Sequence, residues 1–221
     1  MPSFPEALGI QPVVLNLPFG RTCGIEVLWS SPDLKLGHEY IDQLAALHKV
    51  VHNGVRETTI SEWMHATKSI IPPRAYGTNR SLTVRNLTDE RVDIICSNIT
   101  KMLDDKGTVF SLHVLRGSSA KSNKGSVFLA REPHIVVEMI GTTSEPKNEE
   151  AAIAWVLNFR DELAAIIKDQ KGVISHWVAL TPPSEASLQS LYRAHYEFVL
   201  ALKMKYDPHG LFKSAVAQLP V

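Results

Sequence analysis

Titratable side chains gather on one side of two predicted strands in the middle of the sequence. In the strand predicted over 108–115, the alternation of side chains places His113 opposite an apolar set. In the strand predicted over 134–140, alternation does the same for His134 and Glu138. Histidine exchanges protons near neutral pH, and a nearby carboxylate can pair with it and adjust its proton affinity. This pattern predicts an acid/base site with His113 and Glu138 as catalytic residues and His134 as a substrate-binding residue.

A third predicted strand, over 173–180, adds His176 and Ile174 to the candidate site. Apolar walls around a few polar groups are typical of a small-molecule pocket, because they supply affinity and shift the proton affinity of those groups. We therefore expect His176 to be catalytic and Ile174 to line the pocket. The alternative for each histidine is a solvent-facing position on a half-exposed sheet.

Tyr76 is a candidate substrate-binding residue on a different segment, which follows Pro72 and Pro73. A loop there would be able to close over a bound substrate. The alternative is an ordinary surface loop.

The hydrophobic pattern predicts an α+β domain that positions these residues. Alternating, β-branched segments predict strands, and apolar residues three to four positions apart predict helices. The predicted strands cover 24–29, 50–59, 81–87, 108–115, 127–129, 134–140 and 173–180. The predicted helices cover about 36–47, 60–69, 88–102, 148–168 and 181–204. We expect a single antiparallel β-sheet of about six or seven strands, with helices covering one face and the site on the other.

Composition excludes several classes of protein. The 221 residues carry 23 basic and 23 acidic side chains, so no cationic surface for nucleic acid or membrane is expected. The 2 cysteines are too few for a disulfide framework, and no metal site is indicated. There is no signal peptide and no long apolar span, so we expect a soluble, cytoplasmic protein that acts on a small molecule.

Two motifs near the C-terminus resemble the signature of a known family. Residues 192–196 read Y-R-A-H-Y, and residues 205–212 read K-Y-D-P-H-G-L-F. These motifs resemble Y-G-x-N-Y and K-Y-D-P-x-N-x-F of the berberine-bridge-enzyme-like FAD-linked oxidases. The resemblance extends over nearly the whole chain, but only to the substrate-binding domain and C-terminal tail of that family. It implies a substrate-binding domain over 21–221, after an N-terminal extension over 1–20.

The resemblance also assigns residues. His113 falls on or near the strand position where family members have a catalytic base. His176 and Ile174 fall on paired inward positions of a later strand. Arg131 matches a recurrent arginine and is expected to bind substrate; the alternative for Arg131 is a structural ion pair with Glu132 or another loop carboxylate.

Departures from the family pattern concern the flavin. Family members bind FAD mainly through a preceding domain of roughly 200 residues, an ordinary domain size, whereas only residues 1–20 precede the expected domain here. Gly210 replaces the expected asparagine, and Ala215-Val216-Ala217 replaces a polar pair. Because hydrogen-bonding partners of a flavin are replaced together, we expect no cofactor, with FAD as the alternative.

Three functions remain open from the sequence. The first is a flavin-independent enzyme of natural-product biosynthesis that catalyses a cyclisation, an isomerisation or a pericyclic step. The second is an FAD-linked oxidoreductase of the berberine bridge type, either truncated or split between two chains. The third is a non-catalytic binding module. Because apolar residues such as Ile140 would otherwise meet water, we also expect either a homodimer across the open face or a lid formed by residues 4–18.

Overall fold

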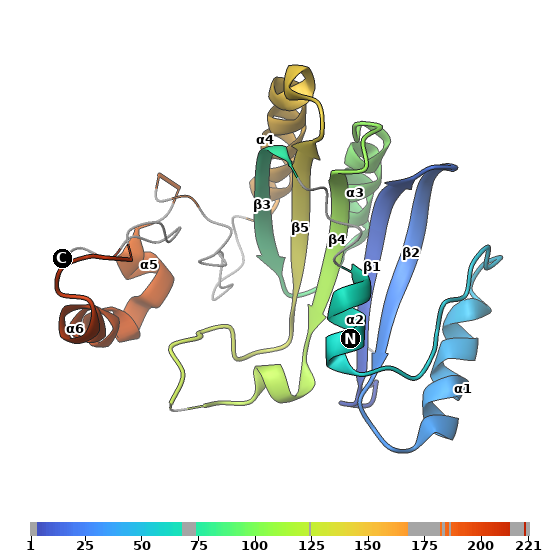
Figure 1. Ribbon diagram of the computed structural model, residues 1–221, viewed down its shortest axis with the longest axis horizontal. Coiled ribbons are helices and arrows are strands. Elements are labelled where there is room, and N and C mark those ends of the chain that lie inside the picture. The colour runs from blue at the N-terminus through green and yellow to red at the C-terminus, as the bar shows by residue number, and fades with distance from the viewer. Residues whose placement is uncertain are drawn as a thin grey trace.

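The computed structural model describes residues 4–67, 74–123, 125–167, 182, 184, 185, 187–212 and 219. Within them, the fold is built on one antiparallel sheet of five strands in the order β2-β1-β4-β5-β3 (Figure 1). The strands are β1 (Leu8–Leu17), β2 (Gly20–Trp29), β3 (Tyr76–Val84), β4 (Thr108–Leu115) and β5 (His134–Thr143). The two strands that carry the candidate histidines and glutamate, β4 and β5, are therefore neighbours.

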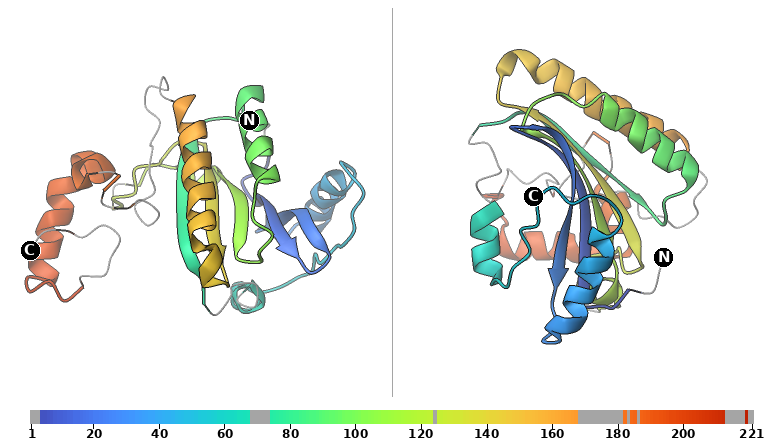
Figure 2. Two further views of the ribbon diagram at one scale, coloured as in Figure 1. Left: turned by 90° about the horizontal axis from the view of Figure 1, so that it is seen from above. Right: turned by 90° about the vertical axis from the view of Figure 1, so that its right-hand side faces the viewer.

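Helices lie on both sides of this sheet. The helices are α1 (Leu34–Ala45), α2 (Ile60–Thr67), α3 (Asp89–Thr100), α4 (Glu149–Ala165), α5 (Leu188–Tyr192) and α6 (Tyr196–Tyr206). Short 3₁₀ turns lie at η2 (Gly117–Ala120), η3 (Pro146–Asn148) and η5 (Arg193–His195). The right-hand view of Figure 2 shows α3 and α4 on one side of the sheet and α2 on the other. We call the side under α3 and α4 the covered face, and the opposite side the open face.

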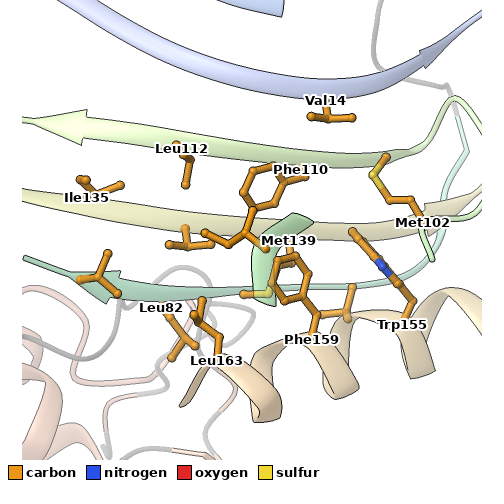
Figure 3. Packing of buried hydrophobic residues seen from close by; sticks show 14 residues of the cluster. Val14, Leu82, Met102, Phe110, Leu112, Ile135, Met139, Trp155, Phe159 and Leu163 are labelled. Atoms are coloured by element: carbon orange, nitrogen blue, oxygen red, sulfur yellow. The ribbon is translucent and has the colours of Figure 1, made fainter. Parts of the chain in front are cut away.

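The hydrophobic core lies between the covered face and α4 (Figure 3). Phe110 of β4 stacks on Phe159 of α4 with ring centroids 5.7 Å apart, and Val137 and Met139 of β5 are fully buried beside them. The helix can approach so closely because β5 has a glycine at this point: a Cβ on Gly141 would lie 2.2 Å from Val156 Cγ2. Burial of this apolar surface is the main stabilising contribution to the fold.

Side-chain hydrogen bonds fix both ends of α3. Thr88 is the N-cap residue and accepts a hydrogen bond from the backbone N–H of Arg91. At the other end, the Arg21 guanidinium of β2 donates to the carbonyl oxygens of Ile99, at 2.9 Å, and Met102. A cation on the exposed carbonyl groups of a helix C-terminus also interacts favourably with the helix dipole.

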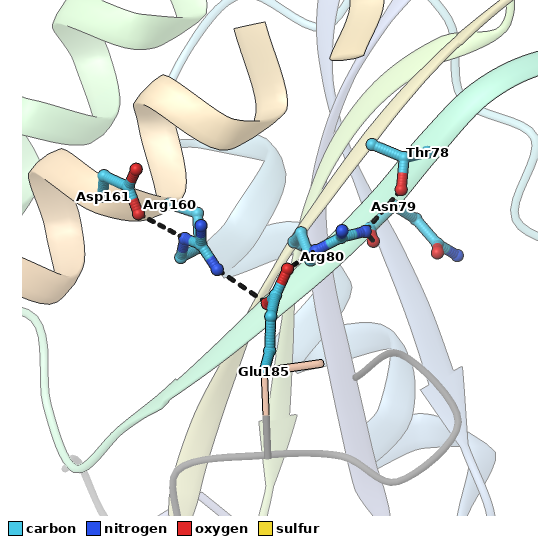
Figure 4. Close-up of polar contacts among 6 residues, drawn as sticks. All are labelled: Thr78, Asn79, Arg80, Arg160, Asp161 and Glu185. Carbon is cyan, nitrogen blue, oxygen red and sulfur yellow. Dashed lines mark hydrogen bonds and ion pairs between the residues drawn. The ribbon is translucent and has the colours of Figure 1, made fainter. Parts of the chain in front are cut away.

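An ion-pair bridge holds the segment before α5 against the sheet (Figure 4). The two carboxylate oxygens of Glu185 lie 2.8 Å from Arg80 Nε on β3 and 2.6 Å from Arg160 Nη1 on α4. Arg160 Nε also lies 2.5 Å from Asp161 Oδ1. The sequence predicts that a helix begins here, but α5 begins only after Ser187, whose hydroxyl accepts from the N–H of Ser190.

The predicted α+β class, with one antiparallel sheet, is confirmed, but the strand count is lower than predicted. Residues 50–59 and 127–129 form no strand, and the strand expected over 173–180 lies outside the described residues. The five observed strands include one that the sequence analysis missed, β1.

The expectation of an N-terminal extension or lid is wrong for residues 8–17, because they form β1 inside the sheet. Pro12 hides this strand in the sequence, since proline is rare within sheets. Pro12 lies just outside Val13–Leu15, the residues of β1 that pair with β4. The N–H group that proline lacks is therefore not needed for the pairing of β1 with β4. The alternative to the lid, a homodimer, stays a prediction.

Candidate functional site

The register of the strands brings polar residues into one row on the open face. Ser111 of β4 lies directly opposite Glu138 of β5, and Glu138 in turn lies opposite Ser81 of β3. One step along the sheet, His113 lies opposite Val136. Since side chains alternate along each strand, these residues point away from the core.

His113, Glu138 and Ser111 form a compact hydrogen-bonded cluster. Oε2 of Glu138 lies 2.9 Å from His113 Nε2 and accepts a hydrogen bond of 2.7 Å from the Ser111 hydroxyl. Because a carboxylate only accepts hydrogen bonds, the contact requires a proton on His113 Nε2. The expectation that Glu138 pairs with a histidine is confirmed, and Ser111 is an additional member that the sequence analysis did not select.

Glu138 is held in its charged form. Burial alone would raise the pKa of this carboxyl, but the hydrogen bonds from His113 and Ser111 and the charge of His113 outweigh burial, so that the pKa lies below the usual 4.5. A carboxylate that stays ionised fixes and orients the imidazole. The His113 side chain is 27% exposed, so among the three it is the one placed to exchange a proton with a bound molecule.

This cluster does not have the geometry of a hydrolase triad. In such a triad, the acid binds one imidazole nitrogen and the serine binds the other. Here both Glu138 and Ser111 lie at Nε2 of His113, and Ser111 is only 2% exposed. Ser111 therefore positions the carboxylate and is not a nucleophile.

Three more buried polar groups lie on the same face as this cluster and lack hydrogen-bond partners among the described residues. Ser81 Oγ, Thr83 Oγ1 and His134 Nε2 have no hydrogen-bond partner in the part of the chain that the structure describes. Almost all buried polar groups in proteins are paired, and an unpaired one is costly. This side of the sheet therefore offers hydrogen-bonding capacity that a ligand or water would use.

His134 lies at the end of this face, opposite Leu115. It is 2% exposed, and its Nδ1 lies 2.6 Å from the Glu132 carbonyl oxygen. The carbonyl only accepts, so Nδ1 carries the proton and Nε2 is left as an acceptor. Its predicted role in binding substrate stays a prediction.

Two of the other predicted site residues, Tyr76 and Arg131, are described and are not part of the His113 cluster. Tyr76 lies at the opposite end of β3, where it pairs with Thr143. The Arg131 guanidinium is used within its own loop: it donates to Ser119 O at 2.9 Å and Ser126 Oγ at 2.8 Å. Within the described residues, Arg131 forms no ion pair with Glu132, which pairs instead with Arg85 at 2.9 Å. Ile174 and His176 lie outside the described residues.

Helix α2 borders the open face on the side of β1 and β2. Trp63 Nε1 donates a hydrogen bond of 2.6 Å to Glu26 Oε1 of β2. The rest of this helix is exposed as far as its side chains are described. Neither residue stands out in the sequence, because their pairing depends on the path of the chain between β2 and α2.

The open-face positions of the described strands lack the groups that would bind the diphosphate of FAD. A dinucleotide is held mainly through its diphosphate, which needs cations or free backbone N–H groups. The open-face positions of the described strands hold aliphatic, hydroxyl, amide, histidine and carboxylate side chains, with no lysine or arginine among them. Within the same residues, no three His, Cys, Asp or Glu side chains cluster as a metal site, and no helix is long and apolar enough to cross a membrane.

The sheet and its helices have the fold of the berberine bridge enzyme-like oxidoreductases, and the resemblance to that family is confirmed. In sequence, the chain is 22% identical over 218 residues to the FAD-linked oxidoreductase aurO of Gibberella zeae, covering 98% of this chain and 42% of that protein. No family model matches.

Solved structures of this fold match nearly the whole chain at low identity. Aclacinomycin oxidoreductase superimposes with a TM-score of 0.70 at 15% identity, covering 97% of this chain and 47% of that one. A variant of berberine bridge enzyme superimposes with a TM-score of 0.69 at 9% identity, covering 99% of this chain and 50% of that one. A variant of Physcomitrella patens BBE-like 1 superimposes with a TM-score of 0.64 at 13% identity, covering 98% of this chain and 48% of that one. The chain thus spans about half the length of the relatives that it matches.

The C-terminal motifs have a structural role in this chain. The Asp207 carboxylate accepts hydrogen bonds from the backbone N–H groups of Leu211, at 2.7 Å, and Phe212, at 3.1 Å, and pairs with Lys203. Arg193 occupies the position of the signature glycine and has a φ of 45°, in the region that glycine adopts readily. Arg193 therefore adopts a positive φ that L side chains rarely have.

Proposed function

We propose that this chain is the substrate-binding part of an enzyme of natural-product metabolism. A small organic substrate binds on the open face, and His113 moves a proton to or from it. Glu138 and Ser111 hold the imidazole in place. The observation that carries the proposal is the contact of His113 Nε2 and the Ser111 hydroxyl with one carboxylate oxygen, within 2.9 Å. A positioned histidine of this kind contributes roughly 10²–10⁴-fold to a rate.

The functions of two structural relatives support a natural-product substrate. One is an aclacinomycin oxidoreductase, and another catalyses the terminal step of gilvocarcin biosynthesis. We infer that the substrate of this chain is a polycyclic compound bearing hydroxyl or carbonyl groups.

For the reaction we propose a cyclisation, isomerisation or pericyclic step that needs acid/base catalysis and no redox change. The cluster supplies a proton-transfer group, an orienting carboxylate and a hydroxyl, which is what such a step requires. The second candidate is FAD-linked oxidation, which the names of the relatives support. In that reaction bound FAD would supply the redox chemistry, and His113 would take up the proton that leaves a substrate hydroxyl.

Ligand binding tests the open face directly. Aclacinomycin and pregilvocarcin, the compounds in the names of two relatives, are titrated into the purified protein while its tryptophan fluorescence is followed. We expect the His113→Ala variant to lose affinity or turnover at least tenfold. The His209→Ala variant, which changes an exposed histidine in the turn after α6, is expected to behave as the wild type. Equal behaviour of the two variants would rule out His113 as the proton-transfer group.

The absorption spectrum separates the two reactions. Purified protein that stays colourless after addition of FAD and gel filtration, but turns over a substrate, supports the flavin-independent reaction. Retention of stoichiometric flavin, or turnover that requires added FAD, supports the FAD-linked reaction. Absence of turnover under both conditions, with ligand binding intact, would leave the binding module as the function.

A further inference from the structure

A cavity lies away from the open-face cluster, between the loop after η2 and the start of α6. It has a volume of about 260 Å³ and is lined by Gly125, Ser126, Val127, His195 and Phe198. Figure 1 shows the two segments, which are far apart in the sequence, at the same end of the molecule. The cavity is smaller than sites for drug-sized ligands, which begin at about 300 Å³, and therefore suits a single substituted ring.

Ser126 presents a hydrogen-bond donor to this cavity. A serine hydroxyl has two acceptor positions and one hydrogen to donate. Ser126 Oγ accepts from the Phe128 N–H at 3.1 Å and from Arg131 Nη2 at 2.8 Å, which uses both acceptor positions. Its own hydrogen has no acceptor among the described residues, so it is available to a ligand.

Arg131 makes this donor stronger and holds it in place. Its guanidinium also donates to the carbonyl oxygens of Ser119 and Phe128 and stacks over the Phe128 ring at 4.8 Å. The loop is thereby tied together on the side away from α6. A hydroxyl that accepts from a cation is polarised toward donation, because hydrogen bonds in a chain reinforce one another.

The opposite wall of the cavity is aromatic. Phe198 of α6 lines the cavity and is 57% exposed, so its ring is accessible to a ligand. His195, half-buried beside it, has no hydrogen-bond partner for its ring nitrogens in the described part of the chain. Aromatic side chains at such positions bind flat rings by offset or edge-to-face stacking.

We infer that this cavity binds an aromatic ring that carries an oxygen acceptor, as in an aryl ketone. The ring stacks on Phe198, and the acceptor oxygen receives a hydrogen bond from Ser126 Oγ. His195 provides a second polar contact at the rim. The inference goes beyond the proposed function, because no residue of the His113 cluster takes part. Arg131 then acts on a ligand through Ser126 and not by direct contact.

Acetophenone is the probe, and ethylbenzene, which has the same shape without the oxygen, is the control ligand. Each is titrated to millimolar concentration into ¹⁵N-labelled protein, where fragment-sized ligands bind measurably. Acetophenone is expected to shift the amide signals of residues 125–127 and of the first turn of α6. Ethylbenzene should bind about fivefold more weakly, the usual contribution of one neutral hydrogen bond.

Variants test each wall of the cavity. Ser126→Ala should weaken acetophenone about fivefold, while Ser126→Thr, which keeps the hydroxyl and its acceptors, should retain binding. Phe198→Leu should weaken both ligands about threefold, whereas Phe212→Leu, at a phenylalanine that is 78% exposed outside the cavity, should change neither. His113→Ala should also leave both ligands unaffected, which separates this site from the open face.

Three results would overturn the inference. The first is the absence of shifts at residues 125–127 at millimolar acetophenone. The second is equal affinity for acetophenone and ethylbenzene, which would exclude the Ser126 donor. The third is unchanged binding in Ser126→Ala and Phe198→Leu while the spectra show that the remaining fold is intact.

Discussion

The two sides of β4 and β5 are built from alternate residues of the same strands, yet they differ in kind. On the covered face, Phe110 and Val137 pack under α4 in an apolar core. On the open face, Ser111, His113 and Glu138 join in a polar cluster. Neighbouring residues of each strand thus have different roles, because one stabilises the fold and the next is available for chemistry. Substitutions on the two faces should separate stability from function.

The largest expected effect is on the covered face. Phe159→Ala removes a fully buried ring that stacks on Phe110 at 5.7 Å, and should lower the free energy of unfolding by about 3–5 kcal/mol. Urea denaturation followed by circular dichroism measures the change. Phe212→Ala, at an exposed ring, should stay within about 0.5 kcal/mol of the wild type. A loss below about 1 kcal/mol for Phe159→Ala would mean that the covered face does not dominate stability.

A smaller effect distinguishes two glycines on opposite faces. Gly141→Ala places a Cβ 2.2 Å from Val156 and 2.4 Å from the Ala152 carbonyl, so α4 must move, at a cost of about 1–3 kcal/mol. Gly24→Ala on β2 meets only Val13, at 3.6 Å, and should be neutral or slightly stabilising. Thermal melting of the two variants makes the comparison. Equal destabilisation would show that α4 does not pack against β5 as closely as described.

The smallest expected effect is a pH dependence that belongs to the open face. The pKa of Glu138 is held below 4.5, by the hydrogen bonds and charge described above, so its ionised form contributes stability above that pH. As pH falls below 4.5, the folded carboxylate must take up a proton and the contribution is lost. Glu138→Gln cannot titrate, so its stability deficit relative to the wild type should shrink as the pH is lowered.

Melting temperatures of both proteins between neutral and acid pH provide the test. Glu150→Gln, at an exposed glutamate in the first turn of α4, is the matched control and should follow the wild type. If the difference between wild type and Glu138→Gln stays constant at all pH values, the carboxylate is not held by His113 and Ser111 in solution.

Strict alternation made the faces of β4 and β5 predictable from the sequence. Successive side chains switch sides of the sheet along Val109 to Val114 and along Ile135 to Ile140. A one-residue error in the assigned faces would therefore have placed His113 in the core. The strand predicted over 108–115 has the same bounds as β4. The pairing of Glu138 with a histidine followed from the same alternation, because both lie on the side away from the apolar set.

Features that depend on contacts between distant parts of the chain were not predictable from the sequence. Residues 50–59 are rich in valine and threonine but have no strand beside them, while β1 contains Pro12 and is a strand because β2 and β4 flank it. Ser111 joins Glu138 only through the register of β4 against β5. Arg131 is held by the carbonyl groups of its own loop, and no pattern of side chains reveals that arrangement.

The place of β1 between β2 and β4 has a consequence for synthesis of the chain. The hairpin of β1 and β2 is synthesised before β4, the second strand that pairs with β1, which follows roughly a hundred residues later. At roughly 5–20 residues per second, this delay is several seconds. During that interval one edge of β1 is unpaired and open to pairing with another chain. Until β4 is synthesised, the β1–β2 hairpin therefore carries an edge that is open to aggregation.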